Sequence, residues 1–255
     1  MTLEALLELL REGILNDRTD RAAGTPDYLW TDATLVTYIN EAQRRFAVKG
    51  LVLRDGSTDE VTKIELVEGQ NTYPLSDKVL AVVSAKREDQ QADLQRVGHA
   101  VLGAYAAPSD NWVDPSAYTS LGPGATLAYA TDGEVSGADG DSLTQVVLRV
   151  HPTPGPDQDG QFIRLRVVRK PLAQLTVADL DAVPEIPEDH HIEMLDWAAY
   201  LALRIVDDDA GAPRRAEEFR KMFEEHVRAA RTLAMRKMFA PMGWGFGRGG
   251  FSWGN

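Results

Sequence analysis

The chain has 255 residues, 44% of them hydrophobic, which is enough for one large domain or two modest ones with a real core. It contains no cysteine, which excludes disulfides, thiolate zinc sites, iron–sulfur clusters and cysteine nucleophiles together. The formal net charge of −12 argues against a protein that wraps nucleic acid, because phosphate binding needs a basic face. Such a charge either keeps the protein soluble or lines a channel through which DNA passes without sticking.

The N-terminal segment, MTLEALLELLREGILNDRTDR, lacks the basic start of a signal peptide, and Glu4 and Glu8 interrupt its apolar part. No run reaches the roughly eighteen apolar residues that a helix needs to span a bilayer. We therefore expect a soluble protein that is made in a cytoplasm and has no membrane partner.

Two amphipathic helices are predicted near the N-terminus. Thr2 is a candidate N-cap for the first, and its apolar stripe consists of Leu3, Leu6, Leu7, Leu10 and Ile14. The polar segment 16–26 is a predicted loop. Thr31 or Asp32 caps the second helix, which Lys49 and Gly50 end. Its apolar stripe consists of Leu35, Ile39, Ala42 and Phe46.

The middle of the chain is rich in short strand candidates that glycine, proline and aspartate separate, a pattern typical of a small antiparallel sandwich or barrel. The clearest is 162–168, where Phe162, Leu165 and Val167 alternate with arginines. The other candidates are 61–66, 71–75, 79–85, 99–105, 126–130 and 144–150. A proline-containing connection, 170–187, then leads back to helical sequence.

A helical hairpin is predicted next. The first helix, 189–207, has a wide apolar stripe at steps of three and four that includes Ile192, Leu195, Ala199 and Ala202. The second, 213–239, is expected to place inward Ala216, Phe219, Phe223, Val227, Ala230 and Ala234. On its wet face we expect two pairs of opposite charge four residues apart, Glu217 with Lys221 and Glu224 with Arg228.

The chain ends in a glycine-rich aromatic segment, 240–255, which we call the tail. Six glycines alternate there with Trp244, Phe246, Phe251 and Trp253, and Arg248 is its one charged side chain. Four large aromatic rings on a glycine-rich terminus are an aggregation hazard unless they dock. Either the tail folds back on its own domain, or it inserts into a partner protein and orders there.

No catalytic, metal or cofactor site is predicted. His190 and His191 are adjacent and cannot form the i,i+4 pair of a zinc site, and the acidic turns around Asp157 and Asp159 lack the remaining calcium ligands. The sequence contains neither a G-x-S-x-G elbow nor a P-loop. Enzymatic activity is therefore not expected.

Several segments in order resemble phage head-to-tail adaptor proteins, also called connector or head completion proteins. They are LLELLREGILND, YLWTDATLVTYINEAQRRFA, NTYPLSDKVLAVVSAKR, VPEIPEDHHIEMLDWAAYLAL and AEEFRKMFEEHV. The resemblance implies a structural virion protein in the neck, present in the host cytoplasm during assembly. It implies a ring, usually of twelve copies, beneath the portal protein of a short-tailed phage and next to the tail or nozzle proteins. DNA then passes through the lumen without sequence-specific binding.

The same resemblance assigns roles to residues. The tail occupies the place of the portal-docking segment, with Pro241, Met242, Trp244, Phe246, Arg248, Phe251 and Trp253 as docking residues. The helices form the body of the ring, with ring-packing residues Ile192, Leu195, Ala199, Ala202, Phe219, Phe223 and Val227.

The predicted fold class is α+β: a bundle of N- and C-terminal helices, an inserted antiparallel β-sandwich or barrel, and an extended C-terminal tail. The expected parts are N-terminal helices (1–55), a β-rich insertion (56–188), a helical hairpin (189–239) and the tail (240–255).

Two other functions are open from the sequence. One is a β-sandwich module that binds carbohydrate or a receptor on a helical stalk, with Trp112, Tyr118 and Tyr129 as stacking residues. The other is a hydrolase that uses scattered carboxylates, although nothing pairs these carboxylates in the sequence.

Overall fold

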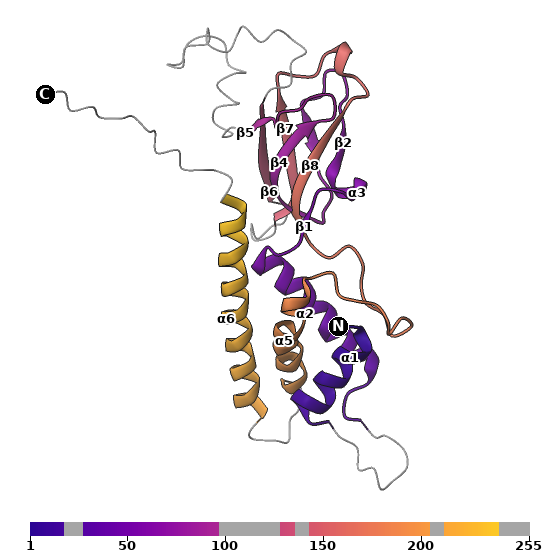
Figure 1. The fold of residues 1–255 in the computed structure, drawn as a ribbon, viewed down its shortest axis with the longest axis vertical. Helices are drawn as coiled ribbons and strands as arrows, with labels where there is room; N and C mark the ends of the chain where they lie inside the picture. The colour runs from indigo at the N-terminus through magenta and orange to yellow at the C-terminus, as the bar shows by residue number, and fades with distance from the viewer. Residues whose placement is uncertain (18–27, 97–127, 136–142, 205–211, 240–255) are drawn as a thin grey trace, which may run out of the picture.

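The computed structural model describes residues 1–17, 28–96, 128–135, 143–204 and 212–239, which form a helical body with a β-sandwich at one end (Figure 1). Both ends of the chain contribute helices to the body, and the middle of the chain forms the sandwich. The α+β class with terminal helices packed together around an inserted β-rich part is therefore confirmed.

The N-terminal helices begin at the predicted caps. Helix α1 (Leu3–Glu8) starts after Thr2, whose hydroxyl accepts a hydrogen bond from the Ala5 N–H at 3.4 Å, and continues as the π-helical segment η1 (Leu9–Leu15). Helix α2 (Asp32–Gly50) starts after Thr31, which accepts from the Thr34 N–H at 3.2 Å. Leu51, with a φ of 55°, ends α2 in the left-handed conformation, and its N–H donates to the Ala47 carbonyl.

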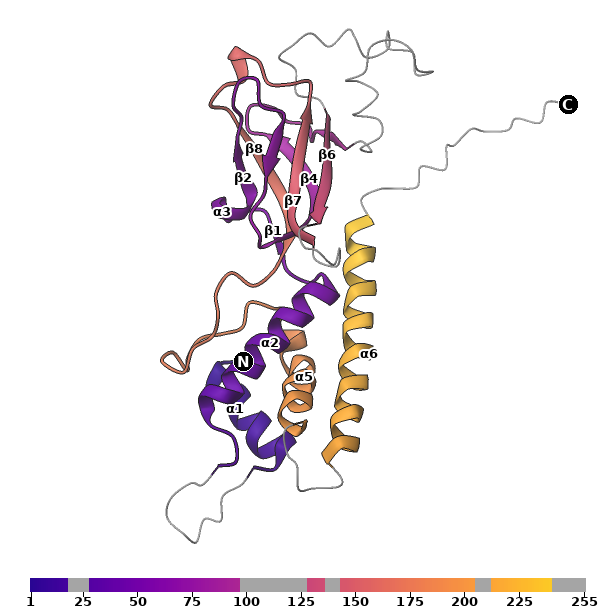
Figure 2. The ribbon, with the colours of Figure 1, turned by 180° about the vertical axis from the view of Figure 1, so that it is seen from behind.

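The C-terminal helices are α5 (His191–Leu203), which follows the 3₁₀ turn η5 (Glu188–His190), and α6 (Ala212–Phe239). Helix α5 begins two residues later than predicted because η5 occupies the chain after Pro187, and its predicted end at 207 lies outside the described residues. Helices α2, α5 and α6 lie side by side in both views (Figures 1 and 2), and each contacts the other two. The Phe223 ring centroid is 5.8 Å from that of Phe46 and 5.1 Å from that of Trp197, so aromatic contacts join the three helices.

The sandwich consists of two sheets. In the first, β8 (Phe162–Arg169) pairs along one edge with β1 (Arg54–Asp55) and β2 (Lys63–Glu65), and along the other with β4 (Val79–Arg87), all antiparallel. The second has the order β3 (Thr72–Pro74), β7 (Leu143–His151), β6 (Ala128–Val135) and β5 (Gln95–Arg96). Its pairs are antiparallel except for β5 with β6, which is parallel.

Strand β8 contributes several buried residues to the core of the sandwich. Ile163, Leu165 and Val167 are buried between the sheets with residues such as Leu148 of β7. The prediction that Phe162 shares this face was wrong, because side chains alternate along a strand and Phe162 has the opposite parity. Its ring instead receives the Lys63 ammonium 3.8 Å from the centroid.

Two predicted strands differ from the structure in instructive ways. The predicted strand 61–66 begins as a helical turn, α3 (Asp59–Thr62), and only β2 is extended. Strand β4 buries Val79, Val82 and Ala85 at steps of three, because two register shifts against β8 each insert an extra residue. The candidate strand 99–105 lies outside the described residues.

Two separate apolar clusters follow from this arrangement, one in the helical body and one in the sandwich. Leu175 and Ile186 of the connection 170–187 belong to the helical cluster. The division of the chain at residues 55, 188 and 239 remains a proposal. It assigns the connection 170–187 to the β-rich insertion, and we propose that the connection belongs with the helical body instead.

Candidate functional site

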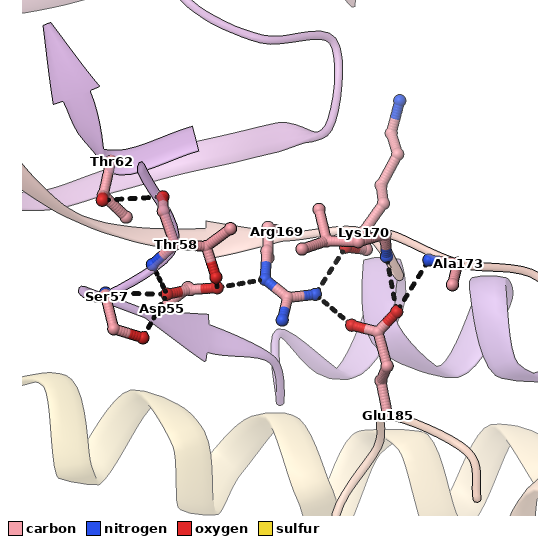
Figure 3. A network of polar contacts seen from close by, with 9 residues as sticks. Asp55, Ser57, Thr58, Thr62, Arg169, Lys170, Ala173 and Glu185 are labelled. Carbon is pink, nitrogen blue, oxygen red and sulfur yellow. Dashed lines mark hydrogen bonds and ion pairs between the residues drawn. The ribbon is translucent and has the colours of Figure 1, made fainter. Parts of the chain in front are cut away.

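A polar network joins the sandwich to the connection (Figure 3). Asp55, at the end of β1, accepts hydrogen bonds at its Oδ1 from the N–H groups of Ser57 at 2.9 Å and Thr58 at 3.0 Å. Its Oδ2 accepts from the Thr58 hydroxyl at 2.8 Å and from Arg169 Nε at 2.7 Å. Asp55 therefore caps the turn after β1 and ties that turn to the end of β8.

Arg169 carries the network onward to Glu185 (Figure 3). Its Nη1 contacts Glu185 Oε2, and the other carboxylate oxygen of Glu185 accepts from the N–H groups of Leu172 at 2.7 Å and Ala173 at 2.9 Å. The Glu185 N–H donates to the buried amide of Gln43 in α2 at 2.9 Å. The chain of contacts thus runs from the sandwich to the core of the helical body. We call Asp55, Thr58, Arg169, Glu185 and Gln43 the junction network.

The network holds its central charges in their ionised forms. Burial alone raises the pKa of Asp55, but the hydrogen bonds from Thr58, Ser57 and Arg169 outweigh it and leave that pKa well below its ordinary value. Burial alone lowers the pKa of Arg169, but the hydrogen bonds of Arg169 to Glu185 and Asp55 outweigh burial, so this pKa lies above its ordinary value. A charged, fully bonded pair of this kind fixes geometry more firmly than an exposed ion pair.

Two further contacts hold the same junction. The Asn40 side chain in α2 pairs with the backbone of Leu175, donating to its carbonyl at 2.8 Å and accepting from its N–H at 2.9 Å. Arg54, next to Asp55 in β1, donates to the Ala234 carbonyl in the last turns of α6. The sandwich is therefore fixed to α2 through the connection and to α6 directly.

Helix α6 buries one narrow face. Ala216, Phe223, Val227, Ala230 and Ala234 are buried as predicted, and Phe219 is half-buried. The predicted charge pairs were wrong in their partners. Arg220 forms both ion pairs, with Glu217 at 2.5 Å and Glu224 at 2.7 Å, because one guanidinium reaches back three residues and forward four.

The predicted ring-packing residues occupy two environments. Within the chain's own helical core lie Leu195, Ala199, Ala202, Phe223 and Val227, with Phe219 packed against it. These six residues pack in or against the core of the subunit, and a ring contact through them remains a prediction. Ile192, by contrast, is 58% exposed and available to a neighbour.

One buried carboxylate in the body is not part of the junction network. Asp196 of α5 lies 3.1 Å from His226 Nδ1 of α6. Burial raises the pKa of Asp196 to about 6, and Glu193 adds to this, while His226 opposes it. This pair joins the two helices with a contact that depends on protonation.

The remaining predicted residues fall into two groups. The whole portal-docking set lies outside the described residues, as do Trp112 and Tyr118. Tyr129, the third proposed stacking residue of the binding-module alternative, is 1% exposed in the sandwich core. Its ring cannot stack on a ligand, and that part of the alternative is corrected.

Within the described part of the chain, no group of three or more histidine or acidic side chains is placed to hold a metal ion. None of the helices described is both long enough and apolar enough to cross a bilayer. His190 contacts Glu193, and His191 contacts the Ile186 carbonyl and the N-terminal ammonium, so both histidines serve local contacts.

Comparison with known protein families identifies the family of this chain. The sequence matches the family described as SU10 adaptor protein over residues 1–243. The chain belongs to the SU10 adaptor protein family. The chain is therefore a phage head-to-tail adaptor, a structural protein and not an enzyme, as the resemblance predicted. No curated protein matches its sequence.

The junction network is the part of this adaptor that sequence reasoning missed. The turn Asp55-Gly56-Ser57-Thr58 contains a signal, because aspartate often caps the N–H groups two and three residues ahead. Nothing near Asp55 in the sequence indicates Arg169, which lies 114 residues away. The network connects the two halves of this adaptor, the sandwich and the helical body, through side-chain contacts.

Proposed function

We propose that this adaptor forms a ring, usually of twelve copies in its family, between the portal protein and the tail proteins, and that its C-terminal tail docks into the portal. DNA passes through the lumen of the ring without sequence-specific binding. The observation that carries the proposal is the placement of α6, a helix of 28 residues that ends at Phe239, immediately before the tail.

Helix α6 is a suitable mount for a docking segment. At a rise of about 1.5 Å per residue it is roughly 42 Å long. Its early turns pack on the helical body through Ala216 and Phe223, and its last turns are held to β1 by the contact between Arg54 and the Ala234 carbonyl. Helix α6 is therefore held to both halves of the subunit.

The composition of the tail suits insertion into another protein. Buried fully, each aromatic ring removes about 150–250 Å² from water. Trp244, Phe246, Phe251 and Trp253 together are sufficient to anchor a terminus, and the glycines let each ring find its own pocket. Pro241 and Met242 begin the docking segment, and Arg248 pairs with an acidic group of the portal. Several identical tails in one ring multiply weak attachments into a firm joint.

The net charge of −12 supports free passage of DNA, because a strongly acidic protein as a whole repels the phosphate backbone. Retention of DNA by the ring is therefore not expected at physiological salt.

Deletion of residues 242–255 tests tail docking. The truncated chain retains both apolar clusters, so it is expected to keep the circular dichroism spectrum and melting temperature of the full chain but to lose co-sedimentation with purified portal. A matched variant with the four aromatic residues of the tail replaced by serine keeps the length of the tail and is expected to fail equally. Co-sedimentation of the truncated chain with portal contradicts tail docking.

A further inference from the structure

The connection 170–187 and the start of α5 expose several apolar and acidic side chains. Leu180 and Val183 are 37% and 56% exposed, and Ile192 is 58% exposed. Asp179, Asp181 and Asp189 are exposed among them and form no ion pair with any residue in the described ranges. We call these six residues the connection face.

The connection face is held in place by the N-terminus. The N–H groups of Leu3 and Glu4 donate to the carbonyls of Ala182 at 2.8 Å and Leu180 at 3.0 Å. The N-terminal ammonium of Met1 lies 3.2 Å from Glu188 and 3.1 Å from His191, next to Ile192. The connection is therefore fixed to the helical body and presents a preformed surface.

A second exposed surface lies along α6 and is apolar and basic. Met222, Ala229 and Leu233 follow one another at steps of seven and four, which places them on one side of a helix. Met222 is 45% exposed and Leu233 is 48% exposed. Leu233 and Ala229 line a groove together with two arginines, Arg228 and Arg236, one acidic residue, Glu225, and Thr232. We call Met222, Arg228, Ala229, Leu233 and Arg236 the helix face.

Helix α6 and the connection lie on opposite sides of the helical body. Figures 1 and 2 show α6 along one side and the connection along the other, with α2 and α5 between them. Neither Arg228 nor Arg236 forms an ion pair with another residue of the described segments. One subunit thus carries an apolar surface with unpaired positive charge and an apolar surface with unpaired negative charge.

From this complementarity, and resting on the proposed ring, we infer that the helix face of one copy packs against the connection face of the next. Two different surfaces that fit each other make a heterologous interface, and such an interface closes into a ring when its rotation allows. The apolar residues are removed from water and the carboxylates meet guanidinium groups, which favours this pairing over either face meeting itself. Ile192, the one exposed member of the predicted ring-packing set, lies in this interface.

Because the chain contains no cysteine, introduced cysteines report the contact directly. A chain with both Leu233→Cys and Val183→Cys, mixed with purified portal and treated with a short bis-maleimide crosslinker, is expected to give a ladder of covalent oligomers. Each single variant alone is expected to give none, and a mixture of the two single variants is expected to stop at dimers. The matched control pairs Leu233→Cys with Val67→Cys, since Val67 is similarly exposed at 44% but lies in the sandwich, and this pair is expected to remain monomeric on denaturing gels.

Two results overturn the assignment. One is a dimer formed by Leu233→Cys alone, which indicates that α6 meets α6. The other is the absence of a ladder from the double variant in particles where electron microscopy shows a ring. If the unmodified chain forms no ring with portal, the proposed ring itself fails, so the two failures are distinguishable.

Discussion

Arg169 Nε lies 2.7 Å from Asp55 Oδ2, although 114 residues separate the two in the sequence. The contact joins β1 and β8 of the first sheet, at the end of the sandwich where the chain enters along β1 and leaves after β8. Through Glu185 it continues to Gln43 in α2. A force applied to the sandwich is therefore transmitted to the helical core through charged and polar contacts as well as through the backbone.

Replacing Asp55 by asparagine is expected to lower the free energy of unfolding by about 2 kcal/mol, because it removes a charge from a bonded pair whose side chains are only 5% and 13% exposed. Urea denaturation followed by circular dichroism measures the change. The control is Asp59→Asn, whose partner Arg164 is more exposed, and it is expected to have a far smaller effect. Equal effects of the two substitutions contradict a special role for the junction network.

The acid sensitivity of the protein is expected to depend on Asp55. Its pKa is lower in the folded than in the unfolded state, so its stabilising contribution is complete above the ordinary value of 3.8 and is lost as the pH falls below it. Comparison of the Asp55→Asn variant with the unmodified chain is expected to show a difference in stability that shrinks towards low pH. A difference that is constant from neutral pH to below 3.8 shows that the carboxylate charge is not responsible.

Asp196 is expected to act in the opposite direction. Burial raises its pKa to about 6, so the stability that it contributes is present below its unfolded value of 3.8 and is lost as the pH rises through 6. Relative to Asp196→Asn, the unmodified chain is expected to lose about 1–2 kcal/mol between roughly pH 4 and pH 7, a figure reduced for solvent screening because His226 is 37% exposed. Thermal denaturation across this range measures it. A gain in relative stability with rising pH argues against the raised pKa.

Two neighbouring residues of α6 separate folding from assembly. Phe223→Ala is expected to lower the free energy of unfolding by about 3–5 kcal/mol, since Phe223 is fully buried against Phe46 and Trp197. Met222→Asp is expected to leave the melting temperature nearly unchanged, because Met222 is 45% exposed, and to weaken ring formation instead. A large drop in melting temperature with Met222→Asp shows that this residue supports the fold and not the interface.

Arg11 is expected to be the most sensitive arginine of the N-terminal region. Its guanidinium donates to Asp32 and to the Trp30 carbonyl, both at 2.6 Å, and lies 3.9 Å from the Tyr28 ring centroid. Arg11→Met removes the donors to a buried carbonyl and is expected to cost about 2 kcal/mol in urea denaturation. The control Arg44→Met removes an exposed pair with Glu41 and is expected to cost much less. Comparable losses in both variants show that burial of Arg11 adds nothing.

Local signals in the sequence predicted the helices well. Thr2 and Thr31 cap their helices as expected, and α6 begins one residue before its predicted start and ends at the predicted residue. Helix caps and helix ends depend on residues within one or two turns of each other, and such residues are close together in the sequence, so the sequence alone predicts them. The apolar spacing of Phe223 and Val227 likewise predicts the buried face because helix geometry fixes it.

Features that depend on distant partners were not predictable. The π-helical segment η1, the two register shifts in β4 and the pairing of Asp55 with Arg169 all arise from contacts between segments that are remote in the sequence. Phe162 and Ile163 illustrate the same limit within one strand, since both are apolar and the opposing sheet decides which one is buried. The exposed residues of the connection, Leu180 and Val183 among them, were also missed, because they come from a segment without periodicity.

The most direct test of the account is an electron microscopy reconstruction of this adaptor bound to its portal protein. The account predicts a rotationally symmetric ring beneath the portal, with Trp244 and Trp253 of each copy in pockets of the portal. Single copies without rotational symmetry, or tails packed against their own subunits, contradict it.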